Sequence, residues 1–193
     1  MISYLLEHNA NIEAIYDGKT PFLHSIENGK ISCSKLLIAS KCNIHKEYSG
    51  MNALHLAASC IHPESLKFIL ELNQFNLVGI SEQGLASIHY AAQSPSVENL
   101  KLLIEVGCNI DLESKIGMTP LYYAIQSFRY LACELLLEKG CRVSNRDNST
   151  SLHTLVFLQV PPYTNELFKI LKMLTNHPNI DLNAVDQRGY TAL

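Results

Sequence analysis

The chain has 193 residues, a formal net charge of −3 and a hydrophobic content of 47%. This apolar content suffices for a continuous core, and no apolar run approaches the roughly 18 residues of a transmembrane helix. No block of like charge stands out, which argues against nucleic acid as the main partner, because phosphate binding needs a basic patch. The first residues, MISYLLEHN, lack the basic and apolar regions of a signal peptide.

A nine-residue phrase recurs along the chain. It reads GKTPFLHSI at 18–26, GMNALHLAA at 50–58, GLASIHYAA at 84–92, GMTPLYYAI at 117–125 and NSTSLHTLV at 148–156. The first residues of successive phrases lie 32, 34, 33 and 31 residues apart, and the next interval, to GYTAL at 189–193, is 41 residues. Regular spacing with a fixed order of residue types predicts a repeat architecture.

Each phrase predicts a short helix. Thr20 and Thr119 can cap a helix with their hydroxyls, and the proline after each suits the first helical position. Asn52 is a good substitute cap, whereas Ala86 is a poor one, so we expect the helix after Ala86 to be weaker by roughly 1 kcal/mol. Residues 148–150 form a glycosylation sequon, which we expect to cap a helix instead.

A second, longer helix is predicted after each short one. Apolar residues recur at spacings of three and four in GKISCSKLLIASKCNIH from Gly29, in VENLKLLIEVGCNID at 97–111 and in YLACELLLEKGCRVS at 130–144. This pattern indicates one buried helical face. Two such helices cannot bury their apolar faces alone, so the units must stack on one another.

The T-P-L-H-x-A phrase, the 33-residue period and the L-L-x-x-G-x-N-I-x ending resemble the ankyrin repeat over essentially the whole chain. The resemblance implies an all-α fold, an α-solenoid of stacked helix-turn-helix repeats with β-hairpin-like fingers at the junctions. Residues 1–193 would form a single solenoid with repeats at 15–46, 47–80, 81–113, 114–145 and 146–185 and partial repeats at 1–14 and 186–193. We expect the chain to be part of a longer array or larger protein; a short protein with frayed ends is the alternative.

Some positions depart from the family pattern. The glycine expected after the first helix is kept as Gly29 but is replaced by Ile61, Pro95 and Phe128, so we expect these three turns to be built differently. Pro161-Pro162 cannot continue a helix and predicts a protruding loop between two helices. Both a tolerated insertion and a binding loop fit this segment.

The cysteines and histidines are expected to be structural. Cys42, Cys108 and Cys141 occupy equivalent positions, and equivalent positions in stacked units lie about 10 Å apart, which is too far for a disulfide, so buried, reduced thiols are predicted. Reduced thiols fit a reducing compartment. No Cys/His spacing suits zinc, and we expect no metal or cofactor. The resemblance implies a hydrogen-bonding role at the finger base for the histidine of the phrase, found at His55, His89 and His153.

The resemblance also implies a partner-binding concave face made by the fingers and first helices. Carried over position by position, it predicts these outward-facing, partner-contacting residues: Tyr48, Met51, Leu56, Leu85, Tyr90, Ile116, Met118 and Tyr123. Tyrosine and methionine are enriched at interface cores, and exposed apolar patches often mark contact sites. The alternative is that these side chains pack on one another between fingers.

The sequence therefore predicts a non-enzymatic, monomeric scaffold that binds a protein, in the cytoplasm or alternatively the nucleus. No catalytic motif for a serine hydrolase, a P-loop or a zinc protease appears, and no enzyme activity is expected. The alternative function is a targeting or spacer segment of a larger effector, channel, toxin or ubiquitin-ligase adaptor whose activity lies elsewhere.

Overall fold

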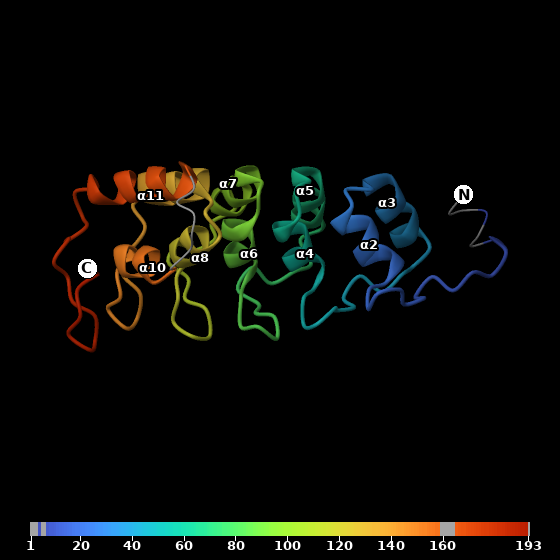
Figure 1. Ribbon diagram of the computed structural model, residues 1–193. Coiled ribbons are helices and arrows are strands. Elements are labelled where there is room, and N and C mark those ends of the chain that lie inside the picture. Colours follow the sequence, from blue (N-terminus) through green and yellow to red (C-terminus); the bar gives the residue numbers. More distant parts are fainter. Residues whose placement is uncertain (1–3, 5–6, 159–164, 193) are drawn as a thin grey trace.

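The computed structural model describes residue 4, residues 7–158 and residues 165–192 (Figure 1). Its helices are α2 (Pro21–Glu27), α3 (Ile31–Ala39), α4 (Ala53–Ser59), α5 (Pro63–Leu72), α6 (Ser87–Gln93), α7 (Val97–Glu105), α8 (Pro120–Gln126), α9 (Tyr130–Glu138), α10 (Ser151–Phe157) and α11 (Asn165–Thr175). No strand forms within the described residues. The predicted α-solenoid is confirmed.

The helices stack as pairs in chain order, each a short helix followed by a longer one, with finger loops projecting along one side (Figure 1). One apolar core runs through the whole stack. The same position of each phrase supplies a buried side chain to this core: Phe22, Leu54, Ile88, Leu121 and Leu152. A seven-residue helix would be marginal in water by itself, so its stability comes from packing against its neighbours.

The predicted caps are present at the starts of the short helices. Thr20 Oγ1 accepts a hydrogen bond from Leu23 N at 3.3 Å, and Thr119 Oγ1 accepts one from Tyr122 N at 3.5 Å. Asn52 Oδ1 accepts from two amides of α4, at 3.0 and 3.1 Å. Ala86 holds the same position without a side-chain cap, and Thr150 of the sequon stands at the start of α10.

The histidines of the phrase are His55, His89 and His153, and we call them the relay histidines because they connect successive units. Nδ1 of His55, His89 and His153 accepts a hydrogen bond from the backbone N–H of the residue before its own helix, at 3.1 to 3.2 Å. Nε2 bonds a carbonyl oxygen at the base of the next finger, on Gly79, Leu112 and Tyr190, at 2.8 to 3.0 Å. Because an amide can only donate and a carbonyl can only accept, each ring must be neutral with its proton on Nε2. The expected structural role is confirmed.

Neighbouring fingers contact one another closely. Lys115 N donates to Gly84 O at 2.9 Å, and Arg146 N donates to Gly117 O at 3.3 Å. Gly84 and Gly117 both have positive φ, at 74° and 82°. A Cβ on either glycine would also collide with the next finger, at Lys115 and Arg146 respectively. Glycine is therefore needed twice, for the turn and for the approach of the neighbouring backbone.

The three turns without the usual glycine are of two kinds. Helices α4 and α6 end in extended residues, Cys60 (φ −77°, ψ 167°) and Ser94 (φ −62°, ψ 145°), so Ile61 and Pro95 follow a turn that needs no positive φ. Phe128 instead keeps the left-handed conformation, at φ 55°. The expectation of a differently built turn is therefore confirmed at Ile61 and Pro95 but wrong at Phe128, whose turn has the same backbone hydrogen bonds as that of Gly29. The loop predicted at Pro161-Pro162 falls within 159–164, outside the described residues.

Alanine substitution separates the two demands on finger glycines. We expect Gly84→Ala to cost about 2–4 kcal/mol of unfolding free energy, because left-handed strain adds to a collision with Lys115. Gly107 has φ 88° and no atom within 4 Å of its Cβ position, so Gly107→Ala should cost only the backbone strain, about 1–2 kcal/mol. Chemical denaturation of both variants measures this difference. Equal costs would show that the finger contact contributes nothing.

Burial of the relay histidines predicts that the stability of the fold depends on pH. Burial lowers the pKa of His55 and His89 below the ordinary 6.5. The folded state then binds fewer protons than the unfolded state, so this stability is fully present above about pH 6.5 and is lost as pH falls below that value. Thermal unfolding midpoints should therefore drop between roughly pH 7.5 and pH 5.5.

Leucine provides a matched control, because Leu23 occupies the equivalent position in the first unit. The double variant His55→Leu, His89→Leu should start from a lower midpoint and lose less of it over the same pH range. Its carboxylates titrate as in the parent protein, so the difference between the two profiles isolates the imidazoles. If the midpoints of the two proteins changed with pH in parallel, the conclusion that these histidines are neutral in the folded state would be contradicted.

Candidate partner-binding face

The structure distributes the eight predicted contact residues over fingers and short helices. Tyr48, Met51, Leu85, Ile116 and Met118 lie on the fingers, whereas Leu56, Tyr90 and Tyr123 lie on α4, α6 and α8. Their exposure differs from the outward orientation that the sequence suggested. Ile116 is 66% exposed and Tyr48, Met51 and Met118 are half-buried, but four are buried: Leu56, Leu85, Tyr90 and Tyr123.

The two buried tyrosines are held by hydroxyls at the base of their own fingers. The Tyr90 hydroxyl hydrogen-bonds Ser81 Oγ at 2.8 Å, and the Tyr123 hydroxyl donates to Ser114 Oγ at 3.1 Å. Each ring also packs edge-on against a relay histidine of the preceding unit, with centroids 5.6 and 5.3 Å apart. Burial raises the pKa of both phenols, which keeps them protonated.

This packing corrects the expected effect of removing the tyrosines. If the two tyrosines faced outward, the double variant Tyr90→Ala, Tyr123→Ala would change the unfolding free energy by no more than about 1 kcal/mol, as surface substitutions usually do. Both rings are only 6% exposed, so each truncation leaves a cavity and costs about 3–5 kcal/mol. The double variant therefore cannot separate binding from folding. Whether the eight residues contact a partner stays a prediction.

Exposed apolar side chains on the fingers include some that sequence reasoning did not select. Ile80 is 55% exposed and lies beside Ala86 in the bridge that closes its finger, and Tyr16 of the first finger is 78% exposed. Val78 and Ile80 alternate with Gly79 and Ser81, and this period of two is typical of an extended segment with one side facing solvent. With Ile116, they give the finger side of the stack several exposed apolar groups.

Ion pairs hold the finger side at both ends of the array. In the first unit the Lys19 ammonium pairs with Glu27 at 2.8 Å and lies 4.7 Å from the centre of the Tyr48 ring. Farther along, Glu113 accepts hydrogen bonds from Arg142 and Arg146, which hold the pKa of its carboxyl below its usual value. Each ion pair joins side chains from different segments of the chain, so these charged groups hold the fingers in position and also keep them hydrated.

The six cysteines are free thiols. Cys60, Cys133 and Cys141 are buried, whereas Cys33, Cys42 and Cys108 are half-buried, so the prediction of burial holds for three of them. Burial raises the pKa of Cys42 and Cys108 to about 11 and that of Cys141 to about 12. Such thiols stay protonated at neutral pH and are poor nucleophiles and metal ligands.

In the described part of the chain, no three His, Cys, Asp or Glu side chains gather where a metal ion could be held. None of the described helices has the length and apolar character needed to cross a membrane.

Known proteins resemble this chain in sequence and in structure. A family model for ankyrin repeats in three copies matches residues 1–78 and 75–147. The B-cell lymphoma 3 protein homolog of Mus musculus is 39% identical over 57 residues, which cover 28% of this chain and 13% of that protein. The potassium channel AKT2/3 of Arabidopsis thaliana is 30% identical over 103 residues, which cover 52% of this chain and 12% of the channel. The matched regions thus span about an eighth of each relative's length.

The fold agrees with a solved structure. The crystal structure of the ankyrin repeat domain of Bcl-3, described as a unique member of the IkappaB protein family, superposes with a TM-score of 0.74 at 21% identity. The superposition covers 99% of this chain and 84% of that one. The repeat phrase, the stacked helix pairs and the family match together show that the chain belongs to the ankyrin repeat family, whose repeats form a protein–protein interaction module.

Proposed function

We propose that this chain is a non-enzymatic interaction module that binds a partner protein on the concave face formed by its fingers and short helices. The observation that supports this function most is the contact between successive fingers. Backbone hydrogen bonds join Gly84 to Lys115 and Gly117 to Arg146, so the surface is organised before a partner arrives. A preformed surface loses little conformational entropy on binding.

The exposed apolar groups of the fingers supply the driving force in this proposal. Ile80 and Ile116 stand more than half exposed on adjacent fingers, with half-buried Met118 at the base of the second. Apolar side chains that gather on a rigid surface are characteristic of contact sites. The buried tyrosines act behind this surface, where they hold the short helices against the fingers. We place the module in the cytoplasm or nucleus and expect it to act as a monomer.

A second candidate is a targeting or spacer segment of a larger protein whose activity lies outside this chain. The curated relatives favour this candidate, because the matched region makes up only 13% and 12% of their lengths. The two candidates differ in where activity resides, and both use the array to bind or position proteins. Neither needs a cofactor or a catalytic group in this segment.

The test replaces exposed isoleucines by glutamate on opposite sides of the stack. Ile80→Glu, Ile116→Glu changes the fingers, and Ile61→Glu changes an equally exposed residue of the α4–α5 turn. Proteins captured from source-cell lysate by the parent chain would be identified by mass spectrometry, and their affinities measured with purified components. We expect the finger variant to weaken binding at least tenfold, or about 1.4 kcal/mol, and the turn variant to bind normally.

Stability is measured on the same proteins. All three side chains are exposed, so the substitutions should change the unfolding free energy by no more than about 0.5 kcal/mol each. Equal binding by the finger variant and the parent would overturn the proposal of a concave-face site. If Ile61→Glu alone lost binding, the partner would instead bind at the α4–α5 turn, at the end of the helices opposite the fingers.

A further inference from the structure

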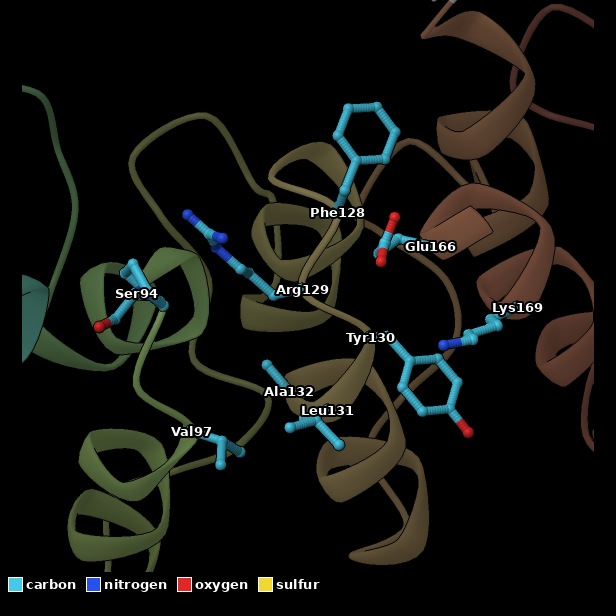
Figure 2. A pocket seen from close by; sticks show the side chains of 10 residues that line it. Ser94, Val97, Phe128, Arg129, Tyr130, Leu131, Ala132, Glu166 and Lys169 are labelled. Atoms are coloured by element: carbon cyan, nitrogen blue, oxygen red, sulfur yellow. The ribbon is translucent and has the colours of Figure 1, made fainter. Parts of the chain in front are cut away.

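Pockets along the stack differ in chemistry. The pocket in Figure 2, of about 400 Å³, has Arg129 and Lys169 on opposite sides of Tyr130 and Glu166 in the same lining, so its charges do not converge on one ligand. A smaller pocket, of about 180 Å³, lies between the ends of α5 and α7. Its lining contains Asn73 and otherwise only apolar residues, which are Leu54, Ile69, Leu70, Phe75, Leu77 and Val106.

The smaller pocket coincides with an extra residue in the second unit. In the third unit, the left-handed residue Gly107 precedes Asn109 by two positions, and the Asn109 side chain accepts a backbone hydrogen bond where the finger begins. In the second unit, left-handed Asn73 precedes Asn76 by three positions, and Asn76 accepts the same bond. The added residue changes the path of the chain as it leaves α5.

A hydrogen bond that other units form is missing at this exit. The N–H of the cysteine after the left-handed residue donates to a helix carbonyl at 2.9 to 3.1 Å, in the pairs Cys42–Leu37, Cys108–Leu103 and Cys141–Leu136. Among the described residues, none that follows α5 donates its N–H to the equivalent carbonyl, that of Ile69. The Phe75 ring instead lies 5.5 Å from the His45 ring of the preceding unit. The pocket thus opens beside a residue whose counterparts in three other units bond the following loop.

The size and lining of the pocket fit one uncharged ring. Leu54 and Ile69 are each only 1% exposed and form its floor, whereas Val106 is 47% exposed and stands at its mouth. An apolar cavity of about 150 Å³ lined by Leu, Ile and Phe is known to bind benzene. An ion would lose its hydration here without a charged partner, because the described lining holds no charged side chain.

The one polar side chain of the described lining can bind a peptide group. Asn73 is exposed, and its amide forms no hydrogen bond within the part of the chain that the structure describes. A side-chain amide both donates and accepts, which matches the N–H and C=O of a peptide and has no counterpart in a hydrocarbon. The amide therefore favours a ring that is attached to a peptide over a free hydrocarbon.

We propose that this pocket binds the phenyl side chain of a phenylalanine in a segment of a partner protein. The ring packs on Leu54 and Ile69, and a peptide group beside it pairs with the Asn73 amide. Pocket size selects the ring, and the free amide selects a peptide. Ile80 and Ile116 of the fingers are outside the lining, so this site does not depend on the proposed finger surface.

The test uses uncharged probes, which are acetyl-Gly-Phe-Gly-amide, acetyl-Gly-Ala-Gly-amide and benzene. Titration of the phenylalanine peptide into the chain with ¹³C-labelled methyl groups should shift the Leu54 and Ile69 methyl resonances saturably, with a dissociation constant of about 5 mM or tighter. The alanine peptide should bind at least about tenfold more weakly, because it buries much less apolar surface.

Variants separate the ring contact from the amide contact. Val106→Phe places a ring at the mouth and should weaken the phenylalanine peptide and benzene at least about fivefold, whereas Lys139→Phe, at the equivalent position of the fourth unit, should change neither. Asn73→Gly keeps the left-handed turn and should weaken the peptide at least about threefold while benzene binds as before. All three positions are exposed, so melting temperatures should stay near the parent's and show that each variant is folded.

Several results would overturn the proposal. One is no saturable shift of the Leu54 and Ile69 methyl resonances up to about 25 mM phenylalanine peptide, a range that covers weak binding. Another is equal affinity for the phenylalanine and alanine peptides, or for Val106→Phe and the parent. Binding of benzene without binding of the peptide would show that the pocket takes a free hydrocarbon and not a side chain of a partner.

Discussion

The whole structure depends on contact between units, because no unit has a core of its own. A helix of seven residues and one of nine have too few hydrogen bonds and too little buried surface to persist alone in water. Stacking buries the same phrase position in unit after unit, and it brings finger glycines against the neighbouring backbone. Neutral histidines add directed bonds between the units that the apolar contacts hold together. Rigidity of the finger face is therefore a consequence of the same contacts that stabilise the fold.

Features that depend on the repeat period and on local chemistry could be predicted from the sequence. The spacing of the phrase predicted the solenoid, and Thr20, Asn52 and Thr119 cap helices because capping depends on neighbours in the chain. Packing of Tyr90 and Tyr123 between the fingers could be given only as an alternative, because it depends on hydroxyls of Ser81 and Ser114 that face these rings only once each finger has folded back. The period shows which way a position faces but not whether a finger covers it.

The turns show the same limit. A missing glycine indicated an altered turn, yet the sequence could not distinguish the extended exit after α4 from the left-handed Phe128. That choice depends on the next helix and on the bonds that the turn can form. Its outcome places an aromatic ring beside Arg129 at the turn between α8 and α9.

The hydrogen bonds between neighbouring units are not the same along the chain, and native-state hydrogen exchange tests their contribution to stability directly. The first unit has Leu23 where the second, third and fifth units have the relay histidine, and no backbone hydrogen bond joins its described finger to the next. Amides of α2 and α3 should therefore exchange through a partial opening at lower free energy than amides of α6 and α8, which should exchange with global unfolding. Equal protection of α2 and α6, with the same dependence on denaturant, would contradict the claim that these inter-unit bonds control stability.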